Sequence, residues 1–181
     1  VLLSPYLWKE KIDAQETELS RNIAFGKPAS ASVNMEHAQD VWDDGAWFGK
    51  NPRDGVQEWT VDLKDTYNIR NAKVFVGGQM GSDCTFYQYE IYTSDDNIHW
   101  EKQTENRRTS WTNGVLDYFT VQEVRYVKVV FVSVDGRLLA GIQKFEVYED
   151  HGVDSVNEYA LSGIVVEDND LVFEPNCLEY R

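Results

Sequence analysis

The sequence is short of positive charge. Its 17 Lys and Arg residues stand against 31 Asp and Glu residues, which gives a formal net charge of −14 at pH 7. Nucleic acids and anionic membranes are bound by basic residues that neutralise phosphates, so this composition argues against both as partners. Neutral ligands, cations and basic proteins remain open.

The residues of covalent and metal chemistry are equally scarce. The two cysteines, Cys84 and Cys177, can form one disulfide or stay free thiols, and they make no Cys/His zinc pattern. The three histidines are scattered, and there is no Gly-x-Ser-x-Gly motif or phosphate-binding loop. Carboxylates are plentiful, but in so acidic a chain their pairing carries little information. We therefore expect no catalytic residues in this chain.

Long apolar runs are also missing. No stretch of about 18 apolar residues occurs, so no transmembrane helix is expected. No signal peptide is visible, and the sequence begins with Val1 rather than Met. The chain is then either a processed protein or a segment of a larger one, and we favour the second interpretation.

What the sequence has in quantity is aromatic and β-branched residues in short runs. Aromatics make up 13% of the chain and apolar residues 42%, which is typical of a folded β-rich domain. In residues 58–63, Trp59, Val61 and Leu63 alternate with polar residues and predict a strand with one buried face. Recurring strands with turn signals between them indicate an antiparallel β-sandwich. The other predicted strands are 72–76, 86–93, 114–121, 124–134 and 143–148.

The chain divides into three parts. Ser4-Pro5 resembles a helix start, and residues 1–21 are expected to form a short helix or tether. Residues 22–149 carry the strand pattern. Residues 150–181 form an acidic extension, in which 161–166 and 171–174 predict one hairpin. This extension either packs on the sandwich or begins a following domain.

Six short motifs follow one another in a recognisable order. They are the entry strand 22–32, Asp44-Gly45 followed by Trp47, the strand 58–63, the run 89–100, the run 124–128 and the closing run 145–148. Their order resembles that of the discoidin, or coagulation factor V/VIII (F5/8) type C, domains. Within this superfamily the sequence most resembles carbohydrate-binding module family 32.

This resemblance implies both a fold and a function. The fold would be a galactose-binding-like jelly-roll β-sandwich of about eight antiparallel strands. The function would be that of a non-catalytic, secreted or cell-surface module that holds a bacterial glycoside hydrolase or similar enzyme on a glycan. The expected partners are then an oligosaccharide or polysaccharide and the other domains of the parent protein.

The resemblance also raises the question of a structural calcium. It makes Asp44 a metal ligand, but the Glu that completes the site in relatives is replaced by Lys144, and an ammonium cannot ligate calcium. The spacer between Gly45 and Trp47 is also shorter than usual. Three alternatives remain: calcium at Asp44, a solvated turn at Asp43 and Asp44, or Lys144 paired with one of these carboxylates in place of the cation.

The residues that grip galactose in the relatives are not found here. The position of their His holds Phe48, their Arg and Asn positions fall near Gln79 and Asp83, and the last loop has no aromatic. A rebuilt carbohydrate site would use aromatic faces for stacking and polar side chains for the hydroxyls. Its candidate residues are Trp42, Phe48, Arg53, Gln79, Asp83, Trp111 and Arg137.

Burial is the competing explanation for the aromatics. Trp42 and Phe48 either line a site or pack inside the sandwich. If they are buried, the alternative is a structural or protein-docking discoidin-like domain with no functional sugar site. The discriminating observation is whether the candidate aromatics surround one concave face. Three tryptophans are expected in the core: Trp47, Trp59 and Trp100.

Overall fold

The computed structural model describes residues 21–77, 87–105, 107–109, 115–134, 139–151, 164–167 and 170–173. The chain divides into two compact units, Arg21–Glu149 and a second one made of Val1–Ser20 and Asp150–Arg181. The helix or tether predicted at 1–21 lies outside the described residues except for Arg21. Both cysteines and four candidate site residues also lie outside them: Gln79, Asp83, Trp111 and Arg137.

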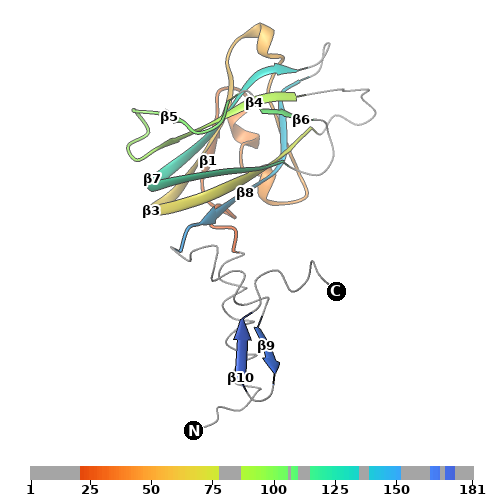
Figure 1. Cartoon of the computed structure of the whole chain (residues 1–181). Coiled ribbons are helices and arrows are strands. Elements are labelled where there is room, and N and C mark those ends of the chain that lie inside the picture. Colours follow the sequence, from red (N-terminus) through yellow and green to blue (C-terminus); the bar gives the residue numbers. More distant parts are fainter. Residues whose placement is uncertain are drawn as a thin grey trace. The chain divides into compact units, whose positions relative to one another are not determined.

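The described part of Arg21–Glu149 is built of antiparallel strands and short 3₁₀ helices (Figure 1). In chain order these are β1 (Ala29–Ala31), η1 (Met35–His37), η2 (Asp40–Trp42), β2 (Trp47–Phe48), η3 (Pro52–Asp54), β3 (Gln57–Val76), β4 (Tyr87–Ser94), β5 (Glu101–Lys102), β6 (Arg107–Thr109), β7 (Val115–Val134) and β8 (Gly141–Glu149). In the second unit, β9 (Ile164–Glu167) and β10 (Asp170–Phe173) pair antiparallel, within the region where two strands were predicted.

The two long strands, β3 and β7, are each bent in the middle. Lys64 in β3 and Glu123 in β7 have positive φ angles of 70° and 57°. The register between the strands shifts repeatedly from Asp62 to Asn71. The sequence predicts two strands in each of these segments. The structure joins them, because pairing between β3 and β7 resumes on the far side of each bend.

The bends divide the strands between two layers. The first half of β3 pairs with β1 and with the second half of β7, which in turn pairs with β4. The second half of β3 pairs with the first half of β7 and with β8, and β8 pairs with β2. This arrangement confirms the predicted all-β sandwich. Among the described residues, no helix is long and apolar enough to span a membrane.

Aromatic side chains fill the space between the layers. The ring centroids of Trp59 in β3 and Phe145 in β8 lie 5.0 Å apart, and those of Trp47 in β2 and Phe131 in β7 lie 6.2 Å apart. Trp47 and Trp59 are fully buried, as predicted. Close aromatic contacts of this kind contribute beyond the area that they bury, and they fix the layers face to face.

The prediction that Trp100 belongs to the core is wrong. Trp100 is only half-buried, and the ammonium of Lys128 lies 3.8 Å from its ring centroid. Asp96 accepts hydrogen bonds from the backbone N–H groups of Ile98 and His99, which folds the chain into an exposed turn after β4. Because this segment is a turn and not a strand, Trp100 reaches the outer surface and makes a cation–π contact there.

The side chain of Asn22 hydrogen-bonds the start of the sandwich to its last strand, β8. Its side-chain amide donates to the carbonyl of Phe145 over 3.1 Å, and its oxygen accepts from the backbone N–H groups of Val147 and Ala24. An isolated β-bridge pairs Asn22 with Tyr148. The turn that follows, which carries Phe25, is therefore held against β8.

Candidate functional site

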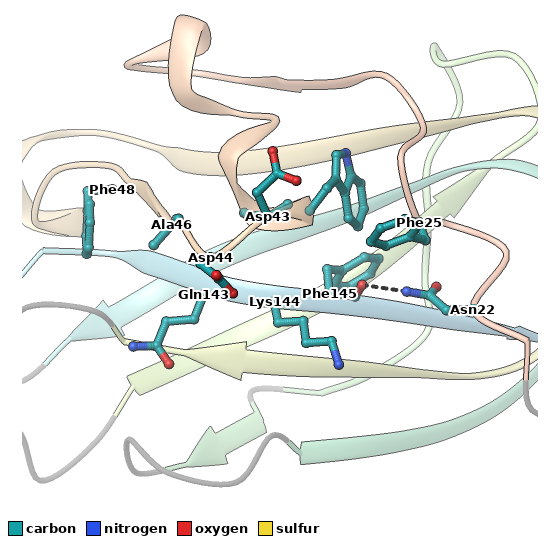
Figure 2. Close-up of a pocket in the computed structure, with 12 residues that line it drawn as sticks. Asn22, Phe25, Asp43, Asp44, Ala46, Phe48, Gln143, Lys144 and Phe145 are labelled. Atoms are coloured by element: carbon teal, nitrogen blue, oxygen red, sulfur yellow. Dashed lines mark hydrogen bonds between the residues drawn. The ribbon is translucent and has the colours of Figure 1, made fainter.

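An open cleft of about 940 Å³ lies within the unit Arg21–Glu149, between the η2–β2 loop and β8. Figure 2 shows Phe48 at one end of the cleft, Phe25 and Asn22 at the other, and Asp44 between them with its carboxylate directed toward β8. The lining residues are Asn22, Phe25, Val41, Trp42, Asp43, Asp44, Gly45, Ala46, Phe48, Gln143, Lys144 and Phe145. Three segments far apart in sequence thus meet at one concave surface.

The loop that carries Asp43 and Asp44 is anchored at both ends. Val41 before it and Trp47 after it are buried, and the indole N–H of Trp47 donates to the carbonyl of Val33 over 2.9 Å. Gly45 packs so closely that a Cβ there would lie 2.9 Å from the carbonyl oxygen of Asp40. These contacts hold the two aspartates between fixed points, with both side chains exposed.

Trp42 forms one wall of the cleft. Its side chain is half-buried, and its indole N–H donates to the carbonyl of Lys27 over 2.8 Å. Its ring meets the buried Trp59 edge-on, with centroids 5.6 Å apart, and meets Phe25 edge-on at 6.5 Å. Trp42 therefore both packs on the core and lines the cleft.

Phe25 and Phe48 are the ends of the aromatic lining. Phe48 is half-buried and is set by the pairing of β2 with β8, where it lies opposite Gly141. Phe25 is 63% exposed, which is unusual for a phenylalanine and leaves most of its ring available. Sequence reasoning missed Phe25, because it read the entry segment only as a mark of the fold. The available sequence signal was Gly26, a residue type that favours turns. In the structure it follows Phe25 in a turn, with a φ of 70°.

β8 contributes Gln143, Lys144 and Phe145 to the lining, and Lys144 also bonds to a residue of β8 beyond the cleft. The ammonium of Lys144 lies 2.6 Å from a carboxylate oxygen of Glu146, and the hydroxyl of Tyr148 donates to the other oxygen over 2.8 Å. Burial raises the pKa of Glu146, but these two hydrogen bonds outweigh it and the net pKa is lowered. Burial, together with the hydrogen bond to Glu146, raises the pKa of Tyr148 to about 12. The three side chains form one ionic cluster.

The pairing of Lys144 with Asp43 or Asp44, one of the alternatives left open by the sequence, is not found. Lys144 points away from Asp44 in Figure 2, and its ammonium is bound to Glu146. Within the described ranges no group of three or more His, Cys, Asp or Glu is placed to hold a metal. Calcium bound by Asp44 together with loop carbonyls stays a prediction.

The cleft brings some of the predicted site residues together and leaves one out. Trp42, Phe48 and Asp44 all line it. Arg53 is exposed on η3, where its backbone N–H binds the side chain of Asn51, and it does not belong to the lining. The lining residues not predicted from the sequence include Asn22, Phe25 and Gln143.

The family follows from these observations and from comparison with known proteins. The family model described as F5/8 type C domain matches residues 17–142, most of the chain. The chain therefore belongs to the F5/8 type C domain family, as its motifs predicted. A comparison with curated protein sequences gave no match.

Solved structures of similar fold include two modules, from Paenibacillus and Clostridium, and a lectin domain. Chitosan-binding module 1 of a chitosanase/glucanase from Paenibacillus sp. IK-5 is 21% identical, with a TM-score of 0.54 over 71% of this chain and 98% of that chain. CpGH89CBM32-6 from Clostridium perfringens is 18% identical, with a TM-score of 0.55 over 72% and 100% of the chains. The lectin domain of Lectinolysin, complexed with Lewis B antigen, is 19% identical, with a TM-score of 0.56 over 72% and 98%. The jelly-roll sandwich is thus shared with all three.

Proposed function

We propose that the chain is a non-catalytic carbohydrate-binding module whose glycan site is the cleft between the η2–β2 loop and β8. The observation that carries the proposal is the lining of this cleft, where Phe25, Trp42 and Phe48 present apolar surface beside Asp44 and Gln143. Sugars are held by aromatic faces against their C–H groups and by planar polar side chains at their hydroxyls. Family membership and the sugar-binding names of the similar structures support this assignment.

A binding role suits the carboxylates of the cleft better than a catalytic one. Asp43 and Asp44 lie on an exposed loop, and within the described part of the chain neither side chain has a hydrogen-bond or ion-pair partner. A general acid or base needs neighbours that tune its pKa and orient it. We therefore place catalysis, where it occurs, in another domain of the parent protein.

We further propose that the module works outside the cell, where it targets a larger bacterial enzyme to its glycan. Modules named in the similar structures come from a chitosanase/glucanase and from a protein of Clostridium perfringens. A weak binding domain linked to an enzyme raises the local concentration of substrate without any new catalytic group.

A glycan array on the folded chain tests the proposal. We expect Phe25→Ala and Phe48→Ala to weaken binding by roughly tenfold, equivalent to about 1.4 kcal/mol. Tyr118→Ala is the matched control, because Tyr118 is 75% exposed on β7 and lies outside the cleft. Binding that both phenylalanine variants retain would place the site elsewhere. If the folded chain binds no glycan on the array, the alternative of a structural or protein-docking domain is favoured.

A further inference from the structure

The cleft carries unbalanced negative charge. Asp43 and Asp44 are both exposed, and among the described residues neither carboxylate has a partner. The single cation in the lining, Lys144, is bound to Glu146 at 2.6 Å and points away from Asp44 (Figure 2). The lining therefore holds two carboxylates whose charge no neighbour compensates.

Aromatic surface lies beside these carboxylates. Phe25 is 63% exposed at one end of the cleft, in contact with the edge of Trp42, and Phe48 lies at the other end. Aromatic faces attract cations through their quadrupole, and a sugar ring presents the C–H groups that pack against such faces. Carboxylates and aromatic rings in one cleft therefore suit a ligand that is both a sugar and a cation.

On the basis of the proposed function, we propose that the cleft selects a glycan with free amino groups, a cationic amino sugar. Its ammonium groups pair with Asp44 and Asp43, while the ring packs on the aromatic lining. An N-acetylated sugar has the same ring but no charge, so it covers the carboxylates without giving them a counterion, and this desolvation is costly. The net charge of −14 adds a long-range attraction for cationic chains.

The experiment compares two oligosaccharides of equal length by titration calorimetry on the full chain, one of glucosamine and one of N-acetylglucosamine, each titrated once with calcium and once with a chelator. We expect the glucosamine oligomer to bind about tenfold more tightly and to lose this advantage as salt screens the charges. Asp43→Asn/Asp44→Asn should weaken its binding by roughly five- to tenfold. Glu36→Gln/Asp54→Asn removes the same charge from exposed sites outside the cleft and should leave binding unchanged.

The outcomes separate this inference from the proposed function. Equal binding of both oligomers, with loss in Phe48→Ala, would overturn the charge selection and leave the glycan site standing. Equal losses in the two double variants would show a general charge effect and also overturn the inference. Binding that requires calcium and disappears with chelator would mean that a metal bridges the carboxylates, which contradicts it as well. Binding of neither oligomer, in a chain that still binds neutral glycans on the array, would overturn only the amino-sugar inference.

Discussion

Arg125 in β7 holds Asp62 in β3 through two parallel hydrogen bonds, with Nε 2.9 Å from one carboxylate oxygen and Nη2 3.0 Å from the other. The pair stands beside the bends of both strands, each residue two positions from the positive-φ residue of its own strand, Lys64 or Glu123. The guanidinium lowers the pKa of Asp62 well below its usual range, against the opposing effect of burial. A bidentate pair of this geometry fixes two strands where their register changes.

Acid should weaken the fold in part through this pair. The pKa of Asp62 is lower in the folded state than the unfolded value of about 3.9, so the stability it adds is complete above about pH 5 and is lost progressively as pH falls from about 5 to 2. We expect Asp62→Asn to lower the free energy of unfolding by about 1 kcal/mol at neutral pH. Between pH 5 and 2, the free energy of unfolding measured by urea titration should decrease less for the variant than for the wild-type protein. Parallel curves for the two proteins would contradict this prediction.

The double role of Trp42 predicts two different losses. Trp42→Phe keeps an aromatic ring but removes the hydrogen bond to Lys27, and we expect it to cost about 1 kcal/mol of unfolding free energy. Trp42→Ala also removes the contact with Trp59, and we expect a cost of about 2–3 kcal/mol, less than for a fully buried tryptophan. Chemical denaturation measures both, with Tyr118→Ala as an exposed control. A Trp42→Ala variant as stable as the wild type would show that the ring only faces the cleft.

The close approach of Gly45 to Asp40 predicts that this glycine cannot gain a side chain. Gly45→Ala places a Cβ at 2.9 Å from both the Cβ and the carbonyl oxygen of Asp40, so the loop must move. We expect a loss of about 1–3 kcal/mol and weaker glycan binding, because Asp44 moves with the loop.

Gly55→Ala is the control for the glycine prediction. Gly55 has a φ of 128° and open space around it, so alanine there strains the backbone without a steric clash. The melting temperature should fall in both variants, whereas glycan binding should weaken only in Gly45→Ala. Unchanged binding in a destabilised Gly45→Ala protein would disprove the link between this packing and the site.

Lys144 lies where the family resemblance implies a carboxylate, and its ammonium predicts that calcium does not stabilise this protein. A ligand that binds the native state raises the melting temperature as its concentration rises. We expect the same melting temperature in excess calcium and in chelator. In Lys144→Glu, which supplies a carboxylate at this position, we expect a melting temperature that rises with calcium. A wild-type melting temperature that depends on calcium would restore Asp44 as a metal ligand.

The strand pattern made the fold predictable from the sequence. Residues 58–63 alternate with period two, and Trp59, Val61 and Leu63 are indeed fully buried. The joining of strands into β3 and β7 was not predictable in this way. Lys64 and Glu123 adopt positive φ without being glycine, which only the surrounding pairing can stabilise.

The lining of the cleft was predictable where its residues are neighbours in the sequence. Trp42, Asp44 and Phe48 come from one short segment, so a single motif brought them to attention. Phe25 joins them because bonds such as that from Asn22 to Phe145 hold its segment on β8. This contact spans 123 positions and leaves no local pattern. Arg53 is also close in sequence, but it lies on the 3₁₀ turn capped by Asn51 and outside the lining of this cleft.

The bridge between Asn22 and Tyr148 has a consequence for how such a module can be combined with others. Antiparallel neighbours of this kind stand about 5 Å apart, so the polypeptide enters and leaves the sandwich at one point of one edge. A module with adjacent ends can be inserted into a surface loop of a host domain without separating the host's own strands. For the same reason a short linker can join the ends, and a circular permutant opened in the exposed turn at residues 95–99 keeps every pairing of the two layers.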